Sequence, residues 1–226
     1  MTGHLSRMAV VLLIAASLFL FDLKLSLADP IITNGSFEAV PIGSPFVSSN
    51  SADVPGWAHG GPVGDGLLWA IGYADPGGSV RVAGAGNQFV TLGGGFIDVG
   101  TANWSTTITG LAVGSSYNVD FMIASEFPAT QTMTVGFLSG SSTASQSFTA
   151  SPSSDNYWRT WVPEMYTFLA SGTSAVINFS VNNQGFDMGL DNVTVTSATT
   201  AVPEPSSLLM AALGLTGLAV RWWRNA

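Results

Sequence analysis

The sequence has no cysteine and very little charge. Of 226 residues, 9% are Asp, Glu, Lys or Arg, and none is cysteine, which excludes a disulfide framework and thiol chemistry. Between Asp29 and Pro205 the chain holds 13 acidic residues, two basic ones (Arg81 and Arg159) and no lysine, a net charge of 2 − 13 = −11. Such a surface argues against nucleic acid and anionic lipid as partners and is compatible with neutral glycans and divalent cations.

Residues suited to catalysis are also scarce. Apart from His4, the only histidine is His59, in a Gly- and Pro-rich stretch that predicts a loop. One histidine cannot form a zinc site, no Gly-x-Ser-x-Gly elbow is present, and a mature region without lysine excludes Schiff-base chemistry. The acids form no recognisable spaced cluster, although 13 of them leave room for a glycosidase-type carboxylate pair. We therefore expect that the protein is not an enzyme.

The N-terminus has the three parts of a secretory signal peptide at residues 1–28. His4 and Arg7 form the basic region, Met8–Phe21 is an apolar core of 14 residues, and small residues at Ser26 and Ala28 predict cleavage before Asp29. The alternative is an uncleaved membrane anchor, which the short apolar run disfavours.

The C-terminus combines a rigid tripeptide, an apolar segment and a basic end. Pro203, Glu204 and Pro205 are held extended by the two prolines. The uncharged segment Ser206–Val220 predicts a helix of roughly 22 Å, and the arginines Arg221 and Arg224 mark its cytoplasmic end. This pattern favours a transmembrane helix. The alternative is a buried helix of a soluble domain, which would need a polar face that is absent.

This order of elements, at residues 203–226, closely resembles the PEP-CTERM protein-sorting signal. The resemblance implies an exported protein of a Gram-negative envelope, held in the inner membrane until an exosortase cuts near Pro-Glu-Pro, and then found at the cell surface or outside the cell. It further implies an exopolysaccharide or biofilm setting. The chain departs from the family pattern in having only two arginines, which are interleaved with Trp222 and Trp223.

Residues 29–196 predict one all-β domain, followed by a short linker at 197–202. Apolar and polar residues alternate in several short segments, which are separated by Gly and Ser clusters. The best segments are Gln88–Leu92, Trp104–Ile108, Tyr117–Ile123, Met133–Phe137, Tyr166–Phe168 and Ala175–Val181. Many short strands with turn signals between them predict an antiparallel two-sheet β-sandwich.

Four short motifs resemble galactose-binding-like sandwiches of the jelly-roll type, as found in choice-of-anchor and DUF642-type surface proteins and in several carbohydrate-binding modules. They are Asn34–Glu38, Val54–Trp57, Asn87–Gly94 and Leu190–Val195. The resemblance spans the domain, but each motif is short. It implies a non-catalytic module with affinity for glycans.

The last of these motifs places a carboxylate in the core. In an unbulged strand Asp191 shares the inward parity of Val193 and Val195, and a buried carboxylate must be paired or bound to metal. With two arginines in the domain, calcium is a natural partner. The resemblance to carbohydrate-binding sandwiches implies a structural Ca²⁺ joining Glu38 and Asp191. The alternative is an Asx turn at Asp191 and a solvated strand end at Glu38.

Tryptophan side chains are the remaining candidates for a sugar site, because sugar faces stack on aromatic rings. A sandwich core also needs large aromatics, and Trp57 and Trp161 fit that role. The polar stretch with Tyr157, Trp158 and Arg159 is the best predicted platform for a carbohydrate, and Trp69 is a second choice.

Three functions remain open from the sequence. The favoured one is a non-catalytic surface or matrix protein that binds glycan within an exopolysaccharide or biofilm layer. The alternatives are a small secreted polysaccharide-active enzyme and a purely structural matrix protein.

Overall fold

The computed structural model describes residues 29–44, 46–48, 54–61, 66–71, 82–93, 101–126, 130–152, 160–182 and 187–198. All of them belong to one compact unit, Leu27–Ala198. The predicted signal peptide, the sorting segment and the Tyr157–Arg159 stretch lie outside the described residues. Within the described residues, no helix is long and apolar enough to cross a membrane.

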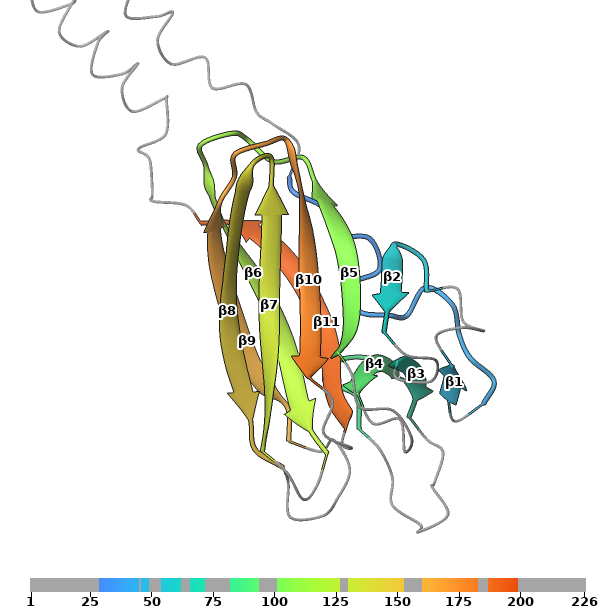
Figure 1. Ribbon diagram of the computed structural model, residues 1–226. Helices are drawn as coiled ribbons and strands as arrows, with labels where there is room; N and C mark the ends of the chain where they lie inside the picture. The colour runs from blue at the N-terminus through green and yellow to red at the C-terminus, as the bar shows by residue number, and fades with distance from the viewer. Residues whose placement is uncertain are drawn as a thin grey trace, which may run out of the picture. The chain divides into compact units, whose positions relative to one another are not determined.

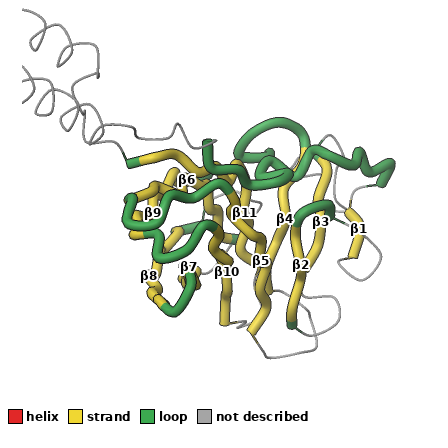
Figure 2. The backbone as a smooth tube through the Cα atoms, turned by 90° about the horizontal axis from the view of Figure 1, so that it is seen from above, coloured by secondary structure: helices red, strands yellow, loops and turns green. Residues whose placement is uncertain are grey.

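Every regular element of the described ranges is a β-strand, as the all-β prediction requires (Figure 2). The strands are β1 (Phe46–Ser48), β2 (Trp57–Gly60), β3 (Gly66–Ala70), β4 (Gln88–Gly93), β5 (Thr101–Thr109), β6 (Ser116–Ser125), β7 (Gln131–Ser139), β8 (Ser142–Ala150), β9 (Val162–Leu169), β10 (Ser174–Asn182) and β11 (Asp187–Ser197).

The strands form two sheets that pack face to face, which confirms the predicted sandwich. One sheet has six strands in the order β1-β3-β4-β11-β6-β9, and the other has five in the order β2-β5-β10-β7-β8. All strand pairs are antiparallel. In Figure 1 the sheet with β7, β8 and β10 lies in front of the sheet with β6, β9 and β11.

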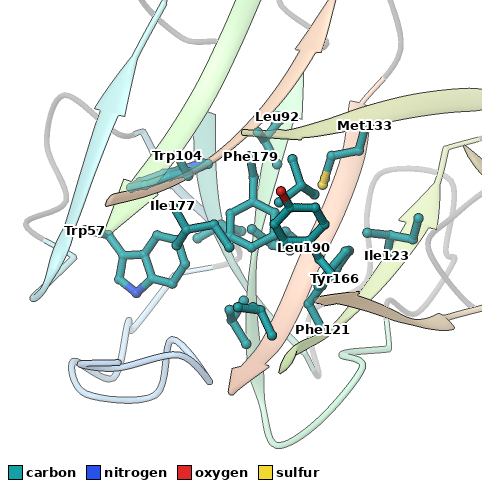
Figure 3. Close-up of a cluster of buried hydrophobic side chains, with 14 of the residues drawn as sticks. Trp57, Leu92, Trp104, Phe121, Ile123, Met133, Tyr166, Ile177, Phe179 and Leu190 are labelled. Carbon is teal, nitrogen blue, oxygen red and sulfur yellow. The ribbon is translucent and has the colours of Figure 1, made fainter. Parts of the chain in front are cut away.

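The core lies between the sheets, because alternate residues of each strand point inward. In β5 the burial alternates along all nine residues from Thr101 to Thr109. Side chains from both sheets meet around Phe179 in Figure 3, with Trp104 and Ile177 from the five-stranded sheet and Phe121 and Leu190 from the six-stranded sheet. Burying side chains of this size stabilises the fold by roughly 1.5–3 kcal/mol each.

A second, smaller cluster lies on the six-stranded sheet. Trp69, Ala83, Phe89 and Ala124 are buried in it, and Trp161 packs beside them, its ring edge-on to Phe89 at 5.3 Å. The Trp161 indole N–H donates to the carbonyl of Val82 over 2.8 Å. This cluster therefore fixes the start of the segment 82–88, which carries the site described below.

Candidate functional site

The loop 33–38 is locked to β11 through backbone contacts at Gly35. The Val193 N–H donates to the Gly35 carbonyl over 2.8 Å. A Cβ atom on residue 35 would lie 1.8 Å from the Val193 carbonyl oxygen, so no other residue fits without moving the backbone. The Asn34 carbonyl in turn accepts the indole N–H of Trp57 over 2.9 Å. The loop 33–38 and the neighbouring part of β11 thus form a joint between the two ends of the β domain.

Three residues other than glycine have positive φ in the described ranges, and all three lie at this joint. They are Asn34 (54°), Phe37 (59°) and Asn192 (50°). Asn192 lies where the pairing of β11 with β6 shifts, between Asp191 and Thr194, as in a β-bulge. Such conformations cost about 1–3 kcal/mol each, persist only where the surroundings hold them, and cluster at functional sites.

The bulge places Asp191 on the face of β11 opposite to the core residues Leu190 and Val193. The expected shared parity with Val193 is therefore wrong, because that expectation assumed a strand without a bulge. The residue is nevertheless 0% exposed, since the segment 82–88 covers it. One oxygen, Oδ2, accepts the Ala85 N–H at 2.8 Å, and Oδ1 accepts the Asn192 N–H at 2.6 Å. Asp191 therefore joins β11 to the segment 82–88.

Glu38, at the end of the loop 33–38, also binds the segment 82–88. Its Oε1 accepts the N–H groups of Asn87 at 2.5 Å and Gln88 at 2.6 Å. Gly86 has φ of +66°, and a Cβ there would lie 2.5 Å from this oxygen. A glycine at this position lets the backbone wrap closely around the carboxylate.

The buried amide of Gln88 completes the joint. Its Nε2 donates to the carbonyls of Phe37 at 2.6 Å and Val40 at 3.0 Å, and its Oε1 accepts the Ile42 N–H at 2.9 Å. Sequence reasoning missed this role. Gln88 is a polar residue at the start of a mostly apolar strand, and this position could have indicated its role. A glutamine buried there needs hydrogen-bond partners from neighbouring segments.

The two predicted metal-binding residues, Glu38 and Asp191, thus converge on residues 84–88. Burial raises the pKa of the Asp191 carboxyl to about 7, and the charge of Glu38 adds to the rise. Hydrogen bonds from the N–H groups of Ala85, Asn192 and Gly84 act in the opposite direction and lower this pKa. No lysine or arginine falls within the described ranges, and no group of three His, Cys, Asp or Glu forms there. The acid pair therefore has no basic side chain of the described part to balance it.

The tryptophans of the described residues pack within the hydrophobic clusters. Trp57 is 9% exposed and packs against Phe37 at 4.9 Å, which confirms its expected core role. Trp69, the second-choice platform, is 6% exposed, donates its N–H to Thr91 Oγ1 at 3.2 Å and packs on Phe46 at 4.9 Å. Its ring therefore presents little surface to a ligand. The platform predicted at Tyr157, Trp158 and Arg159 falls outside the described residues.

His59 lies in a strand and not in the loop that the sequence predicted. Pairing of β2 with β5 places it opposite Trp104, with the two rings 5.0 Å apart. Burial lowers the pKa of the imidazole, so it stays neutral over a wider pH range. The flanking glycines suggested a turn, but β5 supplies pairing partners that the local sequence does not reveal.

A shallow open groove of about 680 Å³ crosses the outer face of the five-stranded sheet. Outward-pointing residues of four strands line it: Asn103 and Ser105 of β5, Val176 and Asn178 of β10, Gly136 and Leu138 of β7, and Thr143 and Ser145 of β8. Gly136 leaves its middle open, because a Cβ there would meet only the Asn178 carbonyl, at 3.8 Å.

The groove is uncharged and mixes polar with apolar side chains. None of the five strands of its sheet contains Asp, Glu, Lys or Arg. Asn178 Oδ1 is buried and has no hydrogen-bond partner, although buried polar atoms are nearly always paired. Sequence reasoning missed this face. Asparagine is uncommon in strands, so Asn103 and Asn178 at outward positions of β5 and β10 were the available signal.

The PEP-CTERM protein-sorting motif matches residues 201–225. The chain carries this motif. It includes all five residues predicted for sorting, namely Pro203, Glu204, Pro205, Arg221 and Arg224. A PEP-CTERM motif implies export, a membrane-anchored precursor and processing by an exosortase to the cell surface. No curated protein matches the chain.

Solved structures that resemble the chain include carbohydrate-binding modules. One is TmCBM61 in complex with beta-1,4-galactotriose, with 14% identity, TM-score 0.46, and coverage of 63% of this chain and 89% of that one. Another is the CBM22-1 xylan-binding domain of Paenibacillus barcinonensis Xyn10C, with 12% identity, TM-score 0.46, and coverage of 69% and 94%. At these identities the ligand of the present chain must be argued from its own residues.

Proposed function

We propose that this PEP-CTERM protein is a non-catalytic surface or matrix protein that binds neutral glycan on the outer face of its five-stranded sheet. The observation that carries the proposal is the uncharged groove with the unpartnered Asn178 Oδ1. If the Asn178 side chain turns towards the groove, a sugar hydroxyl can donate to this oxygen. A hydrogen bond to this acceptor is favourable, because a buried acceptor without a partner carries a desolvation penalty. Exposed Val176 and Leu138 can contact the C–H faces of sugar rings.

The setting fits an exopolysaccharide or biofilm layer of a Gram-negative envelope, as the sorting motif suggests. The net charge of −11 between Asp29 and Pro205 opposes acidic polymers but does not affect neutral ones. A neutral polysaccharide is therefore the ligand class that both the groove and the whole molecule favour.

Binding is favoured over hydrolysis by the residues of the groove. Glycosidases place two carboxyl groups about the bond to be cleaved, and the residues that line this groove include no carboxyl group. The competing proposal, a polysaccharide-active enzyme, would need a carboxylate pair elsewhere in the chain.

A screen of neutral and acidic polysaccharides with the purified unit Leu27–Ala198 tests the function. We expect retention on at least one neutral polymer without release of reducing ends over hours. Release of product would support the enzyme instead. A folded unit that is retained by no polysaccharide would support the purely structural role.

We also propose a structural Ca²⁺ at the acid pair. Two carboxylates wrapped by backbone, without a basic side chain of the described part to balance them, suit a hard cation that prefers carboxylate and carbonyl oxygens. Glu38 and Asp191 would hold the ion, which would neutralise their charges and tie the loop 33–38 to β11.

Melting curves of the unit in EDTA and in excess calcium test this site. A ligand at ~100 times its dissociation constant stabilises the folded state by about 2.7 kcal/mol, so we expect the melting temperature to rise by several degrees. Asp191→Asn and Glu38→Gln should each lose the rise, while Glu164→Gln on β9 should keep it. Identical melting temperatures in EDTA and calcium would rule the site out.

A further inference from the structure

The strand β8 forms one margin of the five-stranded sheet and has no described strand on its outer side. It pairs with β7 along its whole length, from Ser142 to Ala150, without a bulge. In Figure 2 it lies at the opposite end of the sandwich from β1 and β2. Its first six residues, Ser142–Ser147, are all exposed.

The turn that leads into β8 determines which of its backbone groups face outward. Gly140, with φ of 55°, and Ser141 connect the paired residues Ser139 and Ser142, as in a two-residue type II′ hairpin. The closing pair of such a hairpin is hydrogen-bonded, and the pattern alternates from there. The residues that turn N–H and C=O away from β7 are Thr143, Ser145, Ser147 and Thr149.

The other sheet margins carry features that discourage pairing with another chain. β9 contains Pro163, which lacks an N–H, and Glu164. β1 and β2 are only three and four residues long. Short strands, proline and charge are the usual protection of an edge. β8 has nine residues and none of these protections, so it is the described margin best suited to accept a further strand.

The charge distribution leaves β8 free to pair with a second copy of this chain. The charged residues of the described strands all lie in the six-stranded sheet: Asp120 in β6, Glu164 in β9, and Asp187 and Asp191 in β11. Copies with a net charge of −11 between Asp29 and Pro205 repel one another. Of the two described sheets, the five-stranded one allows two copies to meet without bringing strand carboxylates together.

The side chains of β8 are also self-complementary. Hydroxyl groups already pair across the β7–β8 ladder, Thr132 with Thr149 and Thr134 with Ser147, each at 3.2 Å. A copy of β8 placed antiparallel would continue these rows with further serine and threonine hydroxyls. Cross-strand hydroxyl pairs of this kind stabilise sheets by about 0.2–1 kcal/mol each.

We propose that β8 pairs with β8 of a second copy in an antiparallel, two-fold arrangement that joins the two five-stranded sheets into one continuous sheet. Full overlap of Ser142–Ala150 with its copy centres the two-fold axis on Gln146. Ser145 then faces Ser147 of the second copy in a hydrogen-bonded pair, and the two Gln146 residues face each other in a non-hydrogen-bonded pair. The arrangement is independent of glycan binding, and its test contains no glycan.

Disulfide trapping tests the predicted contact, because the natural chain has no cysteine. In Gln146→Cys the two thiols of a dimer would lie opposite each other, at a Cα separation near 4.5 Å that permits a disulfide. We expect the unit Leu27–Ala198 with this change to form a covalent dimer under mild oxidation. The matched control is Thr107→Cys, exposed on β5 of the same sheet, which should form no covalent dimer. Equal cross-linking of the two variants would overturn the proposal.

Two charged double variants test the register in solution. Ser145→Lys with Ser147→Lys places lysines opposite each other, whereas Ser145→Lys with Ser147→Glu places opposite charges together. Sedimentation should show wild-type dimers at high concentration, at least about tenfold weaker dimers for the first variant, and retained dimers for the second. A wild-type unit that is monomeric at every concentration, or equal loss in both variants, would contradict the pairing. Unchanged circular dichroism shows that each variant is folded.

Discussion

At the scale of single residues, a few side chains and glycines hold the two ends of the β domain together. Asp191 and Glu38 accept N–H groups from residues 84–88 and 192, and Gly35 lets β11 approach the first loop. Parity predicted Asp191 on the core face beside Val193, which the bulge contradicts, and only the family resemblance paired it with Glu38. The sequence could not indicate the close approach of Gly35 to Val193, because these residues are 158 positions apart in the chain (193 − 35).

Gly35→Ala is expected to destabilise the unit severely. A Cβ atom 1.8 Å from the Val193 oxygen forces the two backbones apart and breaks their hydrogen bond, so we expect a loss above about 3 kcal/mol in the free energy of unfolding. Gly43→Ala is the matched control, since nothing lies within 4 Å of its Cβ position. Urea unfolding measures both. Similar stabilities for the two variants would contradict the described joint.

The Asp191 carboxyl predicts an unusual pH dependence in metal-free buffer. Its pKa is about 7 when folded and 3.8 as the ordinary value. Between these values the folded state binds more protons than the unfolded state, so the stability should increase as the pH falls from above 7 towards 4. The full gain is on the order of 2–4 kcal/mol. Asp191→Asn should remove this part of the pH dependence, while Glu164→Gln should keep it.

A stability that falls steadily as the pH is lowered from 8 to 5 in EDTA would contradict this burial of Asp191. Added calcium should reduce the dependence, because a bound cation favours the ionised carboxylate.

At the scale of elements, alternation predicted the long strands well and the marginal ones poorly. β5, β6, β7 and β10 bury every second residue against the opposite sheet, so their period is visible in the sequence. β8 was not predicted, since most of its residues are Ser, Thr or Ala and only its last part is buried. β8 is extended because it pairs with β7, and the polarity pattern of β8 alone does not predict this pairing.

The same element scale explains why the groove could not be predicted. Its lining residues come from β5, β7, β8 and β10, and their adjacency depends on the strand order β5-β10-β7-β8. Short motifs along the chain fix neither strand order nor sheet membership. Aromatic residues, which guided the sequence-based search for a sugar site, fill the core of the described part.

At the scale of the whole molecule, charge is separated between the two sheets. The described strands of the five-stranded sheet have no charged residue, and the six-stranded sheet carries the acids and the joint. The uncharged five-stranded sheet therefore carries both the groove proposed for a neutral polymer and the margin proposed for a second copy. The sorting motif at 201–225 implies export and processing to the cell surface, where the proposed glycan binding would be the function of the sandwich.

Retention of the unit Leu27–Ala198 on a neutral polysaccharide, compared between wild type and groove variants, tests the central claim most directly. We expect binding that changes little between ~0.05 M and ~1 M salt, because no ion pair contributes. Gly136→Trp should abolish it by filling the groove, and Asn178→Ala should weaken it about fivefold to tenfold. Thr107→Ala, on the same sheet outside the groove lining, should bind like wild type. Undiminished binding by folded Gly136→Trp, or binding to acidic polymers alone, would contradict the account.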